Sequence, residues 1–347
     1  MAIIDKPTDY FNTVLYTGTG STQSITGLDF QPDLVWWKSR GAAQDHQWYD
    51  VIRGVTKAIE SNKTTAEYTQ SNGLTSFNSD GFTVGDGTAG NASGDTFASW
   101  NWKAGGTASS NTDGSITSSV SANQDAGFSI VSYSGNLSNI GVATVGHGLG
   151  VAPQMIIIKN TNNTADWGVL HTGLTSFNYL IELNTTDAEV DKTGNGSMSA
   201  PTTTVFSTNY TNALNVSGRD YIAYCFAEKQ GYSKFGSYTG NGSTDGTFVY
   251  TGFKPAWVMV KRTDGARNWV MCDNKRDTFN VVNNQLYADL SNAEESAGSG
   301  LGRDFLSNGF KQRGIGAAYN ASGGSYIFMA FAENPFVSST GVPATAR

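Results

Sequence analysis

Three sets of matching segments recur in the same order along the chain, and this repetition constrains the fold more than any other feature. A proline that leads into an apolar run and a lysine occurs three times, at 32–38, 153–159 and 255–261. A second block, which runs from Asn-X-Ser-Gly into aromatic residues, begins at Asn91, Asn215 and Asn320. Because the two blocks shift together, the sequence predicts three tandem units of one fold.

The pattern within each unit favours β-structure. The runs after the prolines are short, continuous and apolar, which is typical of strands buried on both faces. Trp100 and Trp102 in the second block are two residues apart and therefore lie on one face of a strand. Asn-Gly and Asp-Gly pairs mark frequent turns. We predict an all-β protein of three tandem antiparallel β-sandwich units, jelly-roll or lectin-like. One short helical candidate, 50–61, has apolar residues three to four apart.

The repeats also set the expected domain boundaries. The segment 105–127 is rich in Gly, Ser and Thr and has no apolar period, so we predict a flexible linker. We expect the first unit to hang freely from this linker, while the second and third units abut rigidly. The expected divisions are unit 1 at 1–104, the linker at 105–127, unit 2 at 128–230, unit 3 at 231–336 and a frayed C-terminal tail at 337–347.

Composition excludes several classes of function. Charged residues make up 15% of the chain and the net charge is −7, so no broad basic surface is available for nucleic acid or anionic lipid. Two cysteines and three scattered histidines give neither a disulfide framework nor zinc spacing. No segment fits a signal peptide or a membrane span. We therefore expect a soluble protein with no export signal, no cofactor, no metal, no nucleic-acid partner and no membrane insertion.

Candidate catalytic groups do not assemble into a known constellation. The Asp-X-X-Arg pairs at Asp50 and Asp273 are best interpreted as ion pairs at turns. Glu228 and Glu333 occupy equivalent positions in different units, whereas a glycosidase needs two carboxylates within one site. Each post-proline strand ends in a lysine with no recurrent acid partner, and we expect these side chains to reach water. They are Lys38, Lys159 and Lys261. We predict no catalytic residue and no enzymatic activity.

The Asn-X-Ser-Gly motifs are interpreted as turns that lead into the last strand of each unit. Asparagine can cap a turn, and glycine adopts positive φ without steric penalty. The residues assigned this structural role are Asn91, Gly94, Asn215, Gly218, Asn320 and Gly323.

The eight tryptophans raise the question of a sugar platform, because such platforms use exposed aromatic rings. Trp48, Trp167 and Trp269 recur about ten residues after the post-proline strands, which favours packing. Trp36 and Trp37 are adjacent and face opposite sides of the sheet. Core packing is the favoured interpretation of this pair, and one of the two is the candidate for ligand or partner contact.

Several segments of the first unit resemble a family of uncharacterised proteins common in marine bacteriophages. They are the opening DYFNTVLYTG, the run from Ile25 to Lys38, the turn from Phe77 to Phe82 and the ending ASWNWKAGG. The resemblance is close over unit 1 and looser over units 2 and 3. It implies a virion structural protein, of tail-fibre or head-decoration type, without known catalytic residues.

Two functions therefore remain open. The first is a non-enzymatic structural protein on the virion surface, made in the host cytoplasm and packed against capsid, tail or further copies of itself. By analogy with other virion appendages, we expect a homo-oligomer, with a trimer as the leading form. The alternative is a host-recognition module that binds cell-surface carbohydrate through loops or through Trp36 or Trp37.

Overall fold

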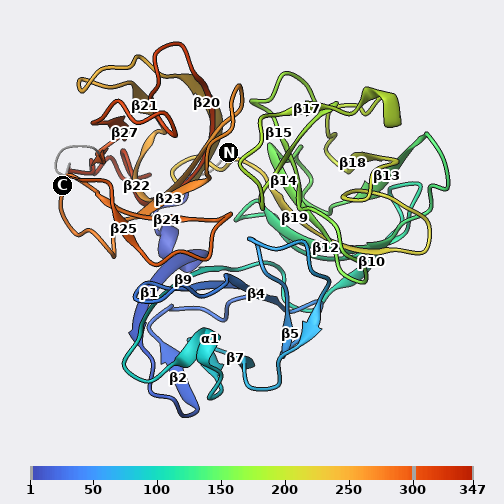
Figure 1. Ribbon diagram of the computed structural model, residues 1–347, viewed down its shortest axis with the longest axis horizontal. Coiled ribbons are helices and arrows are strands. Elements are labelled where there is room, and N and C mark those ends of the chain that lie inside the picture. Colours follow the sequence, from blue (N-terminus) through green and yellow to red (C-terminus); the bar gives the residue numbers. More distant parts are fainter. Residues whose placement is uncertain (1–2, 299–301, 346–347) are drawn as a thin grey trace.

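The computed structural model describes residues 3–298 and 302–345, and the chain in these ranges is an all-β protein of antiparallel sheets. Three lobes lie about a common centre, and they follow one another along the sequence (Figure 1). Each lobe contains a large sheet and a smaller one. The short helical elements are η1 (Pro7–Asp9), α1 (Thr88–Asn91) and η2 (Thr193–Asn195).

The first unit has a large sheet in the order β1-β9-β3-β4 and a small sheet in the order β2-β8-β7. A two-stranded ribbon pairs β5 with β6. The strands are β1 (Phe11–Thr17), β2 (Gln23–Thr26), β3 (Leu34–Ser39), β4 (Gln47–Asp50), β5 (Lys57–Ala58), β6 (Tyr68–Thr69), β7 (Leu74–Asn78), β8 (Gly81–Val84) and β9 (Thr96–Trp102).

The second unit has a longer sheet, in the order β10-β11-β12-β19-β14-β15-β16-β17, and a two-stranded sheet of β13 and β18. The strands are β10 (Ser109–Asn111), β11 (Ser118–Asn123), β12 (Phe128–Ser134), β13 (Val142–Gly146), β14 (Met155–Asn160), β15 (Gly168–His171), β16 (Tyr179–Glu182), β17 (Val190–Asp191), β18 (Val205–Asn209) and β19 (Asp220–Phe226).

The third unit repeats the plan with a large sheet in the order β20-β28-β22-β23-β24-β25 and a small sheet in the order β21-β27-β26. The strands are β20 (Ser233–Thr239), β21 (Phe248–Tyr250), β22 (Phe253–Arg262), β23 (Val270–Asp273), β24 (Asn284–Tyr287), β25 (Glu295–Ser296), β26 (Arg303–Leu306), β27 (Gly309–Gln312) and β28 (Ser325–Pro335).

The post-proline strands β3, β14 and β22 lie inside the large sheets, each between two neighbours. All residues of β3 and β14 are buried, which confirms the prediction of two-sided burial. One face packs against the small sheet of the same unit, as Trp37 does with Phe82 and Val84 in the first unit. The opposite face points to the centre of the molecule.

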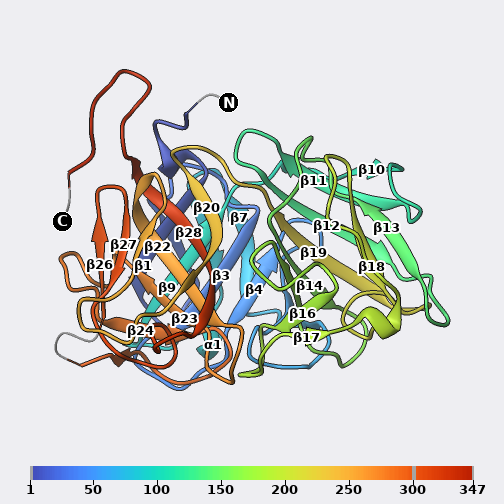
Figure 2. The same ribbon diagram turned by 90° about the horizontal axis from the view of Figure 1, so that it is seen from above.

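A single hydrophobic core fills that centre, and it draws buried side chains from all three units. Trp102 of the first unit lies 6.3 Å, ring centre to ring centre, from Phe226 of the second and 5.6 Å from Phe331 of the third. Phe226 and Phe331 are themselves 6.1 Å apart. Figure 1 shows the first unit lying against both of the other units, and Figure 2 shows the same arrangement from above. The first unit is therefore packed into the molecule, and the prediction that it hangs freely was wrong.

The segment 105–127, predicted to be a flexible linker, forms two strands. β11 pairs with β12 along its whole length, and β10 pairs with β11. Ile116 and Val120 are almost fully buried in the core of the second unit. Small polar residues hid these strands from a hydrophobic pattern, because only a few apolar side chains anchor them.

The helix considered for 50–61 is also absent. The carboxylate of Asp50 accepts hydrogen bonds from the backbone N–H groups of Ile52 and Arg53, which closes a turn after β4. Gly54 then adopts a φ of +89° and Thr56 a φ of +65°, and neither value is compatible with a right-handed helix. The apolar spacing instead serves packing, with Val51 and Ile52 against the central core.

The C-terminal segment, predicted to fray, turns back on itself within its described part. Val337 forms a β-bridge with Pro343, and the backbone N–H of Ser339 donates to the carboxylate of Asp5 at 2.7 Å. These contacts tie the end of the chain to its beginning.

Candidate functional site

Both tryptophans proposed for surface contact are buried. Trp36 is 1% exposed, faces the central core and donates its indole N–H to Nδ1 of His46 at 2.7 Å. Trp37 is fully buried on the other face, where its ring stacks on Tyr49 at 4.8 Å. The contact role considered for this pair is therefore corrected to core packing, because both faces of strand β3 are covered.

The three Asn-X-Ser-Gly turns share one geometry. The asparagine side chains are fully buried, and each Oδ1 accepts a backbone N–H from the turn after β1, β12 or β20 of its own unit. The donors are Thr19 at 2.8 Å, Asn136 at 2.8 Å and Asn241 at 3.0 Å, for Asn91, Asn215 and Asn320 respectively. The glycines Gly94, Gly218 and Gly323 have φ values of +79°, +79° and +73°.

Replacing Gly218 with valine is expected to lower the free energy of unfolding by about 1–3 kcal/mol, since a β-branched residue is strained at positive φ. A Cβ at this position would meet no atom within 4 Å, so the effect would come from the backbone alone. Urea denaturation measures it. Gly194→Val, also in open space but without positive φ, is the matched control and should cost much less. Equal losses in the two variants would contradict the assignment.

The lysines that end the post-proline strands are fully buried, contrary to the expectation that they reach water. Each ammonium group donates to two backbone carbonyls. Lys159 bonds Ala165 at 2.6 Å and, in the first unit, Thr64 at 2.9 Å. Lys261 bonds Arg267 and, in the second unit, Thr186 at 2.7 Å. A loop of the preceding unit thus closes over Lys159 and Lys261, whereas Lys38 bonds the carbonyls of Ser39 and Ala42 in its own unit. The sequence of a single repeat could not reveal the contacts between units.

Burial lowers the pKa of Lys38, Lys159 and Lys261 from 10.5 to about 8. Above about pH 8 the folded chain releases protons from these lysines that the unfolded chain retains, so the three lysines contribute a rise in the free energy of unfolding up to about pH 10.5. Lys159→Met should reduce this rise, and Lys57→Met, at a half-exposed side chain, should leave it unchanged. Urea denaturation across this pH range measures both. An unaltered slope in Lys159→Met would refute the assignment.

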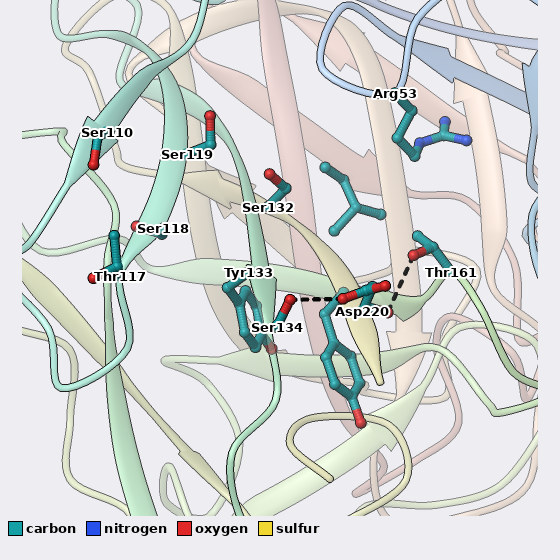
Figure 3. Close-up of a pocket in the computed structure, with 12 residues that line it drawn as sticks. Arg53, Ser110, Thr117, Ser118, Ser119, Ser132, Tyr133, Ser134, Thr161 and Asp220 are labelled. Atoms are coloured by element: carbon teal, nitrogen blue, oxygen red, sulfur yellow. Dashed lines mark hydrogen bonds between the residues drawn. The ribbon is translucent and has the colours of Figure 1, made fainter. Parts of the chain in front are cut away.

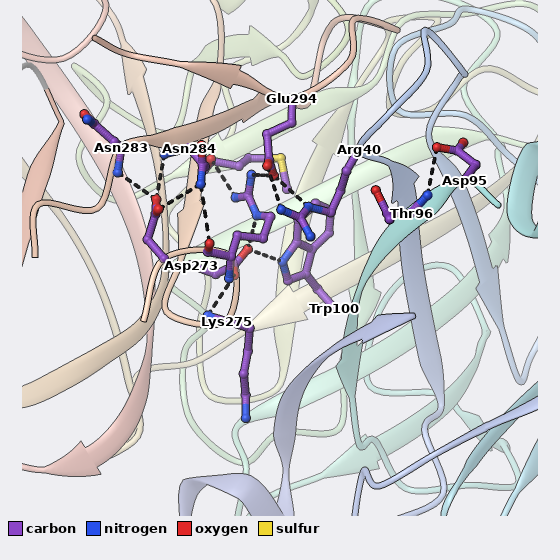
Figure 4. Close-up of polar contacts among 12 residues, drawn as sticks. Arg40, Asp95, Thr96, Trp100, Asp273, Lys275, Asn283, Asn284 and Glu294 are labelled. Carbon is purple, nitrogen blue, oxygen red and sulfur yellow. Dashed lines mark hydrogen bonds and ion pairs between the residues drawn. The ribbon is translucent and has the colours of Figure 1, made fainter. Parts of the chain in front are cut away.

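The Asp-X-X-Arg pairs lie at the borders between units, and Figure 4 shows the pair that begins at Asp273. Asp273 Oδ2 accepts from Arg276 Nε at 2.5 Å and from the indole of Trp100, in the first unit, at 3.1 Å. Arg276 also bonds Glu294, which pairs with Arg40 of the first unit at 2.8 Å. The interpretation as ion pairs at turns is confirmed, and these pairs also join neighbouring units.

The residues equivalent to Asp273 in the first and second units make the contacts at the other two borders. Asp50 Oδ2 accepts from Arg53 Nε at 2.6 Å and from the hydroxyl of Tyr224, in the second unit, at 2.8 Å. In the second unit the position is taken by His171, whose pKa is lowered to about 4 by burial. Its Nδ1 accepts from Gly173 and its Nε2 donates to the carbonyl of Phe328, in the third unit, at 3.2 Å. Each unit therefore binds the next in a closed ring.

Glu228 and Glu333 do not form a carboxylate pair in one site. Glu228 makes an ion pair with Lys234 at 2.7 Å, and Glu333 makes one with Lys254 at 3.5 Å. Each partner lies in the third unit, beside the strand end that carries the carboxylate. These contacts give the two acids separate structural roles.

A pocket of about 440 Å³ lies where strands β10–β12 of the second unit approach Arg53 of the first (Figure 3). Serine and threonine make up most of its lining residues, and Asp220 at one side accepts from Ser134 at 2.7 Å and from Asn162 at 3.1 Å. The Arg53 guanidinium is already bonded to Asp50 and to the carbonyls of Trp48 and Lys57. The serine and threonine residues of the lining are Ser110, Thr117, Ser118, Ser119, Ser132, Ser134 and Thr161.

This pocket can hydrogen-bond a neutral polar ligand, and its lining holds neither a cysteine that could act as a nucleophile nor a histidine that could activate one. Within residues 3–298 and 302–345, no group of three or more His, Cys, Asp or Glu side chains could hold a metal ion. None of the described helices is long and apolar enough to cross a membrane. The hydroxyl pocket was missed by sequence reasoning because one of its walls, with Ser110 and residues 117–119, comes from the supposed linker and the rest comes from distant parts of the chain.

Sequence reasoning also missed two neighbouring aromatic rings that reach the surface. Phe248 is 44% exposed and Tyr250 is 58% exposed, both on β21 of the third unit. The alternation of exposed and buried residues in β21 places them on one outward face. An aromatic residue on each side of a valine was the available signal, but tryptophan content drew attention to the first unit.

These features define an antiparallel all-β protein in which three related units close around one aromatic core. Residues 6–335 match the model of a family described as a domain of unknown function, DUF7483, and the chain belongs to this family. A search of curated proteins found no match.

Proposed function

We propose that this chain is a non-enzymatic structural protein of the bacteriophage virion surface, as a head decoration or fibre or as a tail fibre or appendage. The observation that carries the proposal is the closed ring of three units about a shared core, joined at every border by buried polar contacts. In such a ring, separating two units at one border also disturbs the shared core. This resistance to opening is useful in a virion that is exposed to the environment. The sequence resemblance to phage virion proteins supports the same role.

The proposal includes the finer architecture and the assembly. Each pair of large and small sheets is taken as a β-sandwich of jelly-roll or lectin-like type, and the strands within 105–127 are assigned to the second. Other virion proteins, of capsid or tail, are the proposed partners, and a homo-oligomer, with a trimer as the leading form, is the proposed state. The protein would be made in the host cytoplasm and act at the virion surface.

Gold-antibody labelling of purified virions tests this function. An antibody raised against the chain should label the head or the tail of intact particles in electron micrographs. Virions of an unrelated phage serve as the control. Absence of label on every particle, with the chain present in infected-cell lysate, would overturn the proposal.

Host recognition through cell-surface carbohydrate is the second candidate function. The burial of Trp36 and Trp37 removes the residues first considered for it. The exposed aromatic residues of β21 provide a different surface, and they are the observation that favours this candidate.

A further inference from the structure

We infer that Phe248 and Tyr250 form a stacking platform for a sugar residue of a polysaccharide, and this inference rests on the second candidate function above. The two side chains are separated by Val249, which is 6% exposed and packs inward. Positions two apart on a strand project from the same face, roughly 7 Å apart along it. Both rings therefore lie side by side on the solvent-facing side of β21.

The fold itself does not require aromatic residues at these positions. In the third unit Val249 pairs with Phe310, and in the first unit Ile25 pairs with Phe82 in the same way. This register places Ser24 and Thr26 of the first unit at the positions of the two rings.

The second unit leads to the same conclusion. Val145 pairs with Phe206, which places Thr144 and Gly146 at the positions of the two rings. Two units therefore carry small residues where the third exposes a phenyl and a phenol ring. An exposed apolar pair that packing does not demand indicates a binding role.

Two nearby glycines leave space for the two rings to lie close to the sheet. A Cβ built at Gly309, on the neighbouring strand β27, would lie 3.0 Å from the Phe248 ring. A Cβ at Gly252 would lie 3.5 Å from the hydroxyl of Tyr250. Each ring can therefore rest near bare backbone while its other side stays open.

Charged groups border the platform. Lys311 lies directly opposite Phe248 in the paired strands and forms an ion pair with Asp245. The Asp245 side chain is 81% exposed, so its carboxylate can still accept hydrogen bonds from a ligand. The phenol of Tyr250 adds a further donor and acceptor.

A sugar ring matches this chemistry. Its C–H face packs on aromatic carbon, and its hydroxyl groups bond to carboxylate, ammonium and phenol groups at the rim. The mixed apolar and charged surface is open rather than enclosed, which suits a residue within a long polysaccharide. It fits less well with a second protein copy, because a protein interface core is depleted in charge.

An array of bacterial O-antigen and capsular oligosaccharides, probed with the full chain, provides the test. We expect binding to at least one oligosaccharide, with at least tenfold weaker affinity for the double variant Phe248→Ser and Tyr250→Thr. These substitutions install the residue types that the first unit carries, so folding should be retained, and circular dichroism checks this. Ile140→Ser, which removes a 69% exposed apolar residue from the second unit, is the matched control and should bind normally.

Three results would overturn the inference. The native chain could bind no oligosaccharide, or the double variant could bind as well as the native chain. Sedimentation could also show that the native chain self-associates through this face and that the double variant does not. None of these results bears on the virion location, which antibody labelling decides separately.

Discussion

Replacing Asp273 with alanine is expected to lower the free energy of unfolding by about 3–5 kcal/mol, because it leaves a buried guanidinium without its main partner. Asp273 and Arg276 both have side chains at 0% exposure. The carboxylate also accepts the indole N–H of Trp100 from the first unit and two backbone N–H groups of its own turn. Water cannot reach the site to replace these bonds.

Urea denaturation followed by circular dichroism measures this loss. The control is Asp264→Ala, which breaks the more exposed pair of Asp264 with Arg262 and should change stability by less than about 1 kcal/mol. If the two variants were equally stable, the buried pair would not join the third unit to the first. Because Trp100 lies across the border, Asp273→Ala should also speed amide exchange in both units.

Replacing Trp102 with alanine is expected to destabilise the protein by about 3–5 kcal/mol and to loosen all three units together. The ring packs on Phe11 of its own unit at 5.0 Å, and on Phe226 and Trp257 of the other two units at 6.3 and 6.0 Å. Removing it would leave a cavity where the three large sheets meet.

Trp37→Ala is the matched control, because it removes an equally buried tryptophan from the same sheet. The Trp37 ring faces only its own unit, against Tyr49 and Phe82. Amide hydrogen exchange should therefore rise in every unit for Trp102→Ala, and mainly in the first unit for Trp37→Ala. Identical exchange patterns in the two variants would contradict a core shared among the units.

The sequence predicted the β-class of the fold because its evidence is local and repeated. A proline, an apolar run and a lysine in each unit are enough to predict a central strand, and the structure confirms β3, β14 and β22. The positive φ of the glycines in the turns was predicted for the same reason, since glycine reports a backbone conformation directly, but the burial of the asparagines was not predicted.

What the sequence could not reveal depends on contacts between units. The burial of Lys159 needs a carbonyl of Thr64, about a hundred residues away in the chain. The strands within 105–127 are stabilised by pairing with β12 rather than by their own hydrophobicity. For the candidate platform, the signal lay in a difference between units, Phe248 against Ser24, and repeat matching emphasises likeness.

The closed arrangement of the three units has a further consequence for how such a chain can evolve. An open array of repeats gains or loses a member at its ends, since each member touches only its neighbours. Here the third unit returns to the first through Asp273 and Trp100, and every unit supplies part of one centre. A fourth unit would find no unoccupied edge to bind, and a pair would leave the centre open to water. Closure therefore fixes the number of units at three, and new properties can arise only by altering individual members, as the exposed face of β21 illustrates.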